Sequence, residues 1–163
     1  MKKIVIGIMG PGIGAREIDL QVAYQLGRSI ALADWVLLTG GRNVGVMEAA
    51  NQGAKQEKGL TVGILPTADD RGISQAVDIA IFTDMGNARN NINVLSSDVV
   101  VACGMGSGTA SEVALALKSN KPVILLNCDR PTQVFFQQLS ADRVWISESV
   151  EEGIRTIKTI LNL

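Results

Sequence analysis

The sequence predicts one α/β domain, residues 1–163, with a doubly wound and mostly parallel sheet covered by helices on both faces. Short β-branched segments alternate with longer amphipathic or apolar segments along the whole chain, which is the pattern of strands joined by crossover helices. Most of the short segments are continuously apolar rather than alternating in polarity, as expected of strands buried on both faces. A length of 163 residues is enough for one domain with a sizeable core.

The expected strands are short apolar runs that end at turn residues or polar residues. The first run follows Lys2 and Lys3, is too short for a signal peptide, and ends at Gly10-Pro11-Gly12, which favours a strand followed by a turn. In chain order the expected strands are Ile4–Met9, Val36–Leu38, Leu60–Leu65, Ile79–Phe82, Val99–Ala102, Val123–Leu126 and a short seventh strand at Val144–Ile146.

The longer segments between the strands have the spacing of helices. The last of them has apolar residues at Ile154, Ile157, Ile160 and Leu161, which predicts one stripe facing the sheet. The turn-rich stretch Pro66–Ser74 is expected to form a surface loop. The expected helices are Ala15–Ala33, Gly45–Lys58, Asn87–Ser96, Thr109–Ser119, Thr132–Leu139 and Val150–Leu161.

The composition excludes several classes of function. The chain has no histidine, which excludes Ser-His-Asp and Cys-His nucleophiles, histidine acids and bases, and most zinc sites. Fifteen Lys and Arg residues balance sixteen Asp and Glu residues without any basic run, so we expect no nucleic-acid-binding surface. No stretch approaches the roughly 20 apolar residues that span a bilayer, so we expect no membrane segment and a cytoplasmic location.

Two smaller groups of residues offer no chemistry of their own. Cys103 and Cys128 each end an apolar run and are expected to be buried, reduced thiols. The adjacent carboxylates of Asp69-Asp70 and Glu151-Glu152 diverge from each other and lack further oxygen ligands. We therefore expect no metal held directly by the protein.

Glycines gather in three turns that each follow an expected strand and precede an expected helix. We call them the first, second and third glycine turns. They are Gly10-Pro11-Gly12-Ile13-Gly14, Gly40-Gly41-Arg42-Asn43-Val44-Gly45 and Gly104-Met105-Gly106-Ser107-Gly108-Thr109. In a parallel sheet all three lie at the carboxyl edge, where open α/β folds bind ligands. Each offers free amides at a helix N-terminus. Any one such turn needs glycine in any case, but three together predict an anion site, most simply a phosphate site.

Two common phosphate-binding motifs do not fit this sequence. A dinucleotide-binding dehydrogenase needs an acidic residue at the end of the second strand. Here that strand ends in Leu38-Thr39-Gly40-Gly41, and Asp34 precedes it, at the opposite edge of the sheet. A Walker A loop needs Gly-Lys followed by Ser or Thr, and none of the three turns has this sequence.

The second and third turns and the segment between them contain three motifs. Thr39–Met47 has the form of a Gly-Gly-Gly-x-x-Gly-x-Met turn, Met85–Arg89 of an arginine-bearing segment, and Gly106–Glu112 of the end of a Pro-Gly-Gly-x-Gly-Thr-x-x-Glu motif. Together they resemble the Lonely Guy (LOG) superfamily, whose members are often labelled lysine decarboxylases, as far as about Leu126. Ala88–Asn91, Leu95–Val100 and Cys103–Lys118 are most similar to the branch of the molybdenum cofactor carrier proteins.

This resemblance implies a Rossmann-like fold and a homo-oligomer, either a dimer or a tetramer. The phosphoribohydrolases of the superfamily cleave a nucleoside 5′-monophosphate into base and ribose 5-phosphate, with an arginine and a glutamate at the centre. Arg89 and Glu112 stand at these positions. The carrier branch binds the phosphate-bearing pterin of the molybdenum cofactor and is not known for turnover.

The chain departs from the hydrolase pattern in three places. Gly104-Met105 replaces the Pro-Gly pair, Asn90 replaces the lysine after the arginine, and Arg42 replaces the third glycine of the first motif. The first two changes bring in a flexible apolar side chain and remove a mobile cation, and both count against hydrolysis. Arg42 adds a guanidinium suited to forked hydrogen bonds with phosphate.

We therefore expect a protein that binds, protects, stores and transfers the molybdenum cofactor, with no reaction of its own. The alternative is a LOG-type phosphoribohydrolase that cleaves N-glycosyl bonds, in which Arg89 and Glu112 are catalytic. The expected cofactor-binding residues are Gly10, Pro11, Gly12, Gly40, Gly41, Arg42, Asn43, Gly45, Met47, Arg89, Asn90, Gly104, Met105, Gly106, Ser107, Gly108, Thr109 and Glu112.

Some residues near the third turn have two interpretations. Thr109 to Glu112 has the spacing of a capping box, so Glu112 either returns a hydrogen bond to the helix start or accepts hydrogen bonds from the ligand. Ser107 and Thr109 either donate to phosphate or cap the helix. The apolar run 113–117 predicts a helix that is buried all round.

Three further groups complete the expected site and core. The amides of Asn87, Asn90, Asn91 and Asn93 are expected to form, with Arg89, a wall that binds a pterin or purine edge. Met9, Met47, Met85 and Met105 either fill the core or line the site beside a flat ring. Trp35 and Trp145 are expected to pack against helices or at a subunit contact.

Overall fold

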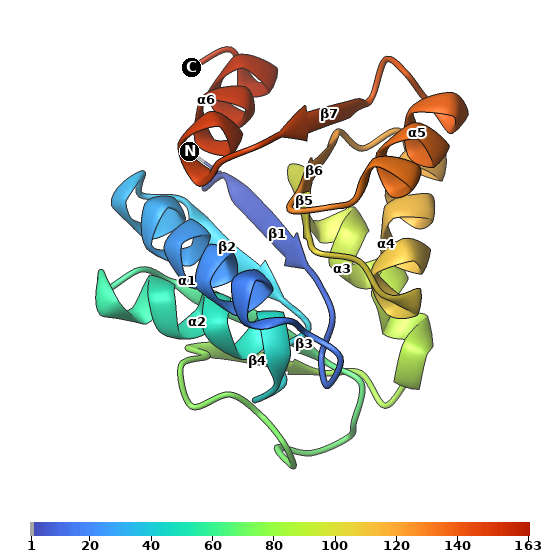
Figure 1. Ribbon diagram of the computed structural model, residues 1–163. Coiled ribbons are helices and arrows are strands. Elements are labelled where there is room, and N and C mark those ends of the chain that lie inside the picture. Colours follow the sequence, from blue (N-terminus) through green and yellow to red (C-terminus); the bar gives the residue numbers. More distant parts are fainter. Residues whose placement is uncertain (1) are drawn as a thin grey trace.

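The computed structural model describes residues 2–163 and has three layers, with a sheet of seven strands between two layers of helices (Figure 1). The strands are β1 (Val5–Met9), β2 (Val36–Thr39), β3 (Thr61–Leu65), β4 (Ile79–Phe82), β5 (Val99–Cys103), β6 (Val123–Leu126) and β7 (Val144–Ser147). Every neighbouring pair is parallel. The α/β fold class is confirmed, and each strand lies within one residue of its expected ends.

The helices cover both faces of the sheet. They are α1 (Glu17–Leu32), α2 (Gly45–Gln56), the 3₁₀ helix η1 (Gly86–Arg89), α3 (Asn90–Ser96), α4 (Ser107–Lys118), α5 (Arg130–Leu139) and α6 (Val150–Leu161). α1, α2 and α6 pack on one face, and α3, α4 and α5 on the other (Figure 1). The single helix expected at Asn87–Ser96 is instead η1 followed by α3, entered through Gly86 at a φ of +53°.

The order of the strands places a crevice between β1 and β5. The order across the sheet is β4-β3-β2-β1-β5-β6-β7, so the chain winds outward from β1 to β4 and then returns to β5 beside β1. The turns that follow β1 and β5 therefore lead to helices on opposite faces. Open α/β sheets bind ligands where the winding reverses in this way, and here the first and third glycine turns stand at that point.

Each face of the sheet has its own apolar core. On one face Ile6 and Ile8 of β1 pack with Leu26 of α1 and Ile157 of α6, all fully buried. Trp35 belongs to this core and Trp145 packs at its edge, so both tryptophans lie against helices, as expected. The stripe expected on α6 is confirmed. The second core, under α3, α4 and α5, is built on alternate residues of β5 and β6.

The expectation of two buried thiols holds for Cys103 and only in part for Cys128. Cys103 is buried, Cys128 is half-buried, and both are free thiols. Burial raises the pKa of both, that of Cys128 to about 11, so both are protonated at neutral pH. Among residues 2–163, no helix combines the length and apolar character that crossing a membrane requires.

α1 and α2 pack backbone to backbone through two glycines. A Cβ added at Gly27 would lie 3.0 Å from the backbone N of Ala54, and one at Gly53 would lie 2.8 Å from the backbone C of Tyr24. The helices would have to separate to admit either atom. Because α2 begins at the end of the second glycine turn, this contact also helps to fix the direction in which α2 leaves that turn.

Replacing Gly27 by Ala is expected to lower the free energy of unfolding by about 2 kcal/mol, because the overpacking cost exceeds the helix propensity gain of about 1 kcal/mol. Gly153→Ala in α6 is the matched control, since its Cβ would find its nearest atom, Ser147 Cβ, at 4.0 Å. That variant should gain about 0.5–1 kcal/mol. Urea denaturation measures both, and a stabilised Gly27→Ala would contradict the close helix contact.

Candidate functional site

A cleft of about 360 Å³ lies at the carboxyl edge of the sheet, where the three glycine turns meet. This volume falls within the roughly 300–1,000 Å³ of small-molecule sites. The cleft is lined by the end of β1, the three turns, η1 and the starts of α2, α3 and α4. The lining residues are Ile8, Met9, Gly10, Pro11, Gly12, Gly14, Gly40, Arg42, Met47, Asn87, Arg89, Asn90, Met105, Gly106, Ser107, Gly108, Thr109 and Glu112.

Four of the expected binding residues do not line the cleft: Gly41, Asn43, Gly45 and Gly104. The three glycines among them have positive φ values of 74°, 58° and 72°, so they shape the turns. Ile8 lines the cleft although it is not among the expected binding residues, and Gly14, the last residue of the first glycine turn, lines it as well. Ile8 lies in β1, two residues before the first turn, so extending that cluster toward the strand would have included it.

The first turn contacts the backbone of the second turn and lies beside the third. A Cβ at Gly10 would lie 2.5 Å from Cγ1 of Val46, which directly follows the second turn, and 2.6 Å from the carbonyl oxygen of Cys103, which directly precedes the third. A Cβ at Gly45 would overlap the carbonyl oxygens of the first turn. Val46 donates its amide to the oxygen of Pro11 at 3.0 Å. The turns therefore form one continuous surface.

A buried carboxylate joins the start of α1 to Asn127, which follows β6, and lies beside the third turn. Asp19 of α1, 1% exposed, accepts hydrogen bonds from the amide of Arg16 at 2.9 Å, from its guanidinium at 2.8 and 3.0 Å, and from Asn127 Nδ2 at 2.6 Å. Gly104 passes so close that a Cβ there would lie 2.6 Å from Oδ1 of Asp19. Burial opposes ionisation, but the hydrogen bonds prevail and lower the pKa of Asp19.

The amides at the start of α4 are free to bind an anion. The N-cap of α4 is Gly106, and no side chain caps the helix. The amides of Ser107, Gly108 and Thr109 are the first three of the helix and have no acceptor within it. A Cβ at Gly108 would meet nothing within 4 Å, so there is room for a ligand to reach this helix end.

The capping-box interpretation of Thr109 and Glu112 is wrong. Because α4 begins at Ser107, Thr109 is its third residue and Glu112 its sixth, and neither makes a capping hydrogen bond. Ser107 does not cap it either, since it is the first helical residue. Glu112 accepts instead from Asn93 Nδ2 of α3 at 2.9 Å. The expectation that α4 is buried all round is also wrong, since Ala114 is exposed.

Arg89 is a buried cation with unused donors. It is 8% exposed and lies over the end of β2, where a Cβ at Gly40 would lie 2.6 Å from Nη2. Its Nε is buried without a hydrogen-bond partner. Among residues 2–163 it pairs only with Glu112, with 3.9 Å from Nη1 to Oε1, which is too long for a hydrogen bond. A hydrogen-bond acceptor on a ligand would satisfy the unused donors of this guanidinium.

The charges of the cleft shift one another's pKa values. Burial lowers the pKa of Arg89, the positive charge of Arg42 acts in the same direction, and Glu112 opposes both. Burial raises the pKa of Glu112, while the hydrogen bond from Asn93 and the charge of Arg89 act against that rise. An anionic ligand would favour the charged form of Arg89.

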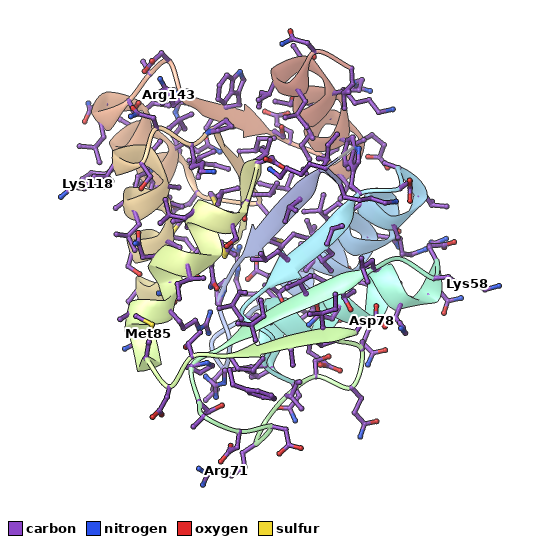
Figure 2. The ribbon with its side chains drawn as sticks, turned by 180° about the vertical axis from the view of Figure 1, so that it is seen from behind. Lys58, Arg71, Asp78, Met85, Lys118 and Arg143 are labelled. Atoms are coloured by element: carbon purple, nitrogen blue, oxygen red, sulfur yellow. The ribbon has the colours of Figure 1, made fainter. Side chains whose placement is uncertain are left out.

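Some of the asparagines and methionines that were expected at the site line the cleft, and others do not. Asn87 and Asn90 line the cleft, whereas Asn93 is buried behind it and Asn91 faces a neighbouring hollow. Met9, Met47 and Met105 line it. Met85 does not, because it is 49% exposed on the outer surface at the start of η1 (Figure 2). Within residues 2–163, no group of three or more His, Cys, Asp or Glu side chains could hold a metal ion.

The chain is similar to one protein family and to several known proteins. The SLOG cluster4 family matches residues 3–154. The molybdenum cofactor binding protein from the phototrophic bacterium Rippkaea orientalis is 64% identical, with a TM-score of 0.97 over 99% of both chains. The molybdenum cofactor carrier protein from Chlamydomonas reinhardtii is 50% identical, with a TM-score of 0.95 over 99% of this chain and 100% of that one. A protein of Archaeoglobus fulgidus is 47% identical over 126 residues, which are 77% of this chain and 82% of that protein.

Replacing Asp19 by Asn is expected to lower the free energy of unfolding at neutral pH by about 2–4 kcal/mol. The folded-state pKa of Asp19 is below its ordinary value of 3.8. The ionised carboxylate therefore makes its full contribution to the free energy of unfolding at a pH well above 3.8. That contribution is lost as the pH falls through the folded-state pKa. The difference between wild type and variant should stay constant above about pH 5 and shrink below about pH 4.

Urea denaturation across this pH range measures the difference. Glu17→Gln is the control, since Glu17 is an exposed carboxylate two residues away on the same helix. A stability difference for Asp19→Asn that persists unchanged to pH 3 would contradict the role assigned to the ionised carboxylate.

Proposed function

The chain belongs to the SLOG cluster4 family, and we propose that it is a carrier that binds, protects and transfers the molybdenum cofactor. The observation that supports this most directly is the match, over nearly the whole chain, to two proteins that are named for binding or carrying this cofactor. A buried guanidinium with free donors, in a cleft of suitable volume, is the local feature that agrees with it.

The residues of the cleft fit a phosphate ester with a flat ring. The phosphate is assigned to the free amides at the start of α4 and to the exposed guanidinium of Arg42, which suits forked hydrogen bonds to a phosphate. The ring is assigned to the space between Met9, Met47 and Met105. Arg89 Nε and Thr109 Oγ1, both buried without partners, border this space.

A carrier must protect the bound cofactor from water and oxygen, and it needs no catalytic residues. The bound cofactor holds the metal through its own sulfur atoms, so the protein needs no metal ligands. Its task is to keep water and oxygen from the ligand and to leave one side open for release. The cleft is lined in part by glycines and by Met9, Met47 and Met105, and it lies at the edge of the sheet.

The proposal extends to a homo-oligomer. β4 is an edge strand with the exposed apolar side chains Ile79, Ile81 and Phe82, at 47, 44 and 46% exposure. An exposed apolar edge strand is a surface that proteins normally cover. A second copy of the chain is the proposed cover, and light scattering after gel filtration tests this assignment.

The second candidate is a LOG-type phosphoribohydrolase, which is favoured by one observation: Arg89 and Glu112 lie together in the cleft. In that function Glu112 would assist attack on the anomeric carbon of the ribose, and Arg89 would stabilise the developing charge. Release of adenine from AMP at enzyme-like rates, abolished in Glu112→Ala, would support this candidate over a carrier without turnover.

Ser107→Asp is expected to reduce retention of the cofactor by about tenfold or more, because it places a negative charge at the amides assigned to the phosphate. The protein is mixed with the cofactor and separated from unbound ligand by gel filtration. The retained cofactor is then oxidised to its fluorescent pterin and quantified. Stability of the fold should change much less than retention does.

Ala114→Asp is the matched control, because Ala114 is exposed two turns along the same helix and does not line the cleft. It should retain the cofactor as wild type does. Unchanged retention by Ser107→Asp, or equal losses in both variants, would contradict the assignment of the phosphate to α4.

A further inference from the structure

Glu112 is a buried carboxylate whose orientation is fixed from behind. It is 7% exposed, and its Oε1 accepts a hydrogen bond from Nδ2 of Asn93 at 2.9 Å. Asn93 is itself fully buried, and its backbone oxygen accepts from Ser97 Oγ at 2.8 Å. The carboxylate therefore has a defined direction. An ionised carboxylate has about four acceptor positions, and the hydrogen bond from Asn93 occupies one of them.

Donors lie beside this acceptor. Oε1 of Glu112 is the oxygen that lies 3.9 Å from Nη1 of Arg89, and no hydrogen bond joins the two side chains. The cleft thus presents, side by side, a carboxylate with free acceptor positions and a guanidinium with a buried, unpartnered Nε. A ligand edge with donors for the carboxylate and an acceptor for the guanidinium would satisfy both, and two adjacent donors would engage both oxygens of Glu112.

The distance from the anion-binding amides suits such a ligand. Ser107 and Glu112 are five residues apart on α4, which corresponds to about 7.5 Å along the helix axis. A phosphate at the helix start and a ring edge at Glu112 would therefore be separated by roughly one flat heterocycle. Met9, Met47 and Met105 line the space between them.

We infer that Glu112 and Arg89 recognise the 2-amino-4-oxopyrimidine edge of a pterin. This edge offers an amino group, a ring N–H and a carbonyl oxygen in a row. The two donors would face the oxygens of Glu112 as a forked pair, and the carbonyl would accept from Arg89. The inference rests on the proposed function, which supplies the phosphate-bearing ring, and adds to it a residue that sets specificity.

Recognition by Glu112 requires hydrogen-bond donors at the edge of the ring that faces it. A lumazine differs from a pterin by a carbonyl oxygen in place of the 2-amino group, so it turns one donor of this edge into an acceptor. That oxygen would face the carboxylate of Glu112 without a proton between them. Adenine presents a ring nitrogen acceptor where the pterin has its N–H, so it too is disfavoured.

The test compares two probes with the same phosphate: 6-hydroxymethylpterin monophosphate and 6-hydroxymethyllumazine monophosphate. Calorimetry should show the wild-type protein binding the pterin about tenfold or more tightly than the lumazine, since a site built to accept a ligand N–H rejects the analogue without it. In Glu112→Gln the amide can donate to the lumazine oxygen. The preference should then shrink to within about threefold or reverse.

Glu48→Gln is the control, since Glu48 is a half-buried helical carboxylate outside the cleft. It should keep the wild-type preference. If Glu112 had only a structural role, Glu112→Gln would bind both probes more weakly by the same factor, and this result would overturn the inference. The ratio of the wild-type protein's affinities for the two probes is a test that needs no variant. Equal affinity for the pterin and the lumazine would also overturn the inference.

The outcomes separate this inference from the proposed function. Retention of the cofactor without any preference between the two probes would leave the carrier function standing and remove the role of Glu112. A pterin preference that depends on Glu112, in a protein that fails to retain the cofactor, would support edge recognition and contradict the carrier function.

Discussion

The close approach of three glycine turns is the constraint on which the rest of the structure depends. The first turn lies between the second and the third with no room for a Cβ at Gly10. At a positive φ, Gly45 meets the carbonyl oxygens of the first turn, and Gly104, also at a positive φ, abuts the carboxylate of Asp19. Because backbone touches backbone, the free amides share one surface. The reversal of winding between β1 and β5 opens the space that this surface encloses.

The cleft also maintains an unfavourable arrangement of charge. A buried guanidinium that makes no hydrogen bond and a buried carboxylate whose pKa is raised are each costly in a folded protein. The surrounding structure holds both in place, Arg89 over Gly40 and Glu112 against Asn93. Groups that are left incomplete at one edge of a rigid sheet are typical of a site that a ligand completes.

The sequence predicted the sheet and the position of the cleft well, because both depend on local patterns. Continuous apolar runs mark buried parallel strands, and the glycine clusters mark their carboxyl ends. The partners of individual side chains were less predictable. Glu112 has capping-box spacing, but α4 starts two residues before Thr109, and the residue that holds Glu112, Asn93, comes from another helix. Likewise, only tertiary packing determines that Gly104 abuts Asp19 while Gly108 faces open space.

The most direct test of the central claim is a crystal structure of the protein with the molybdenum cofactor bound. The phosphate should lie within about 3 Å of the amides of Ser107, Gly108 and Thr109, with the ring between the three turns and its amino edge toward Glu112. A phosphate bound away from the glycine turns, or a cleft that remains without the ligand while the cofactor binds on another surface, would contradict it.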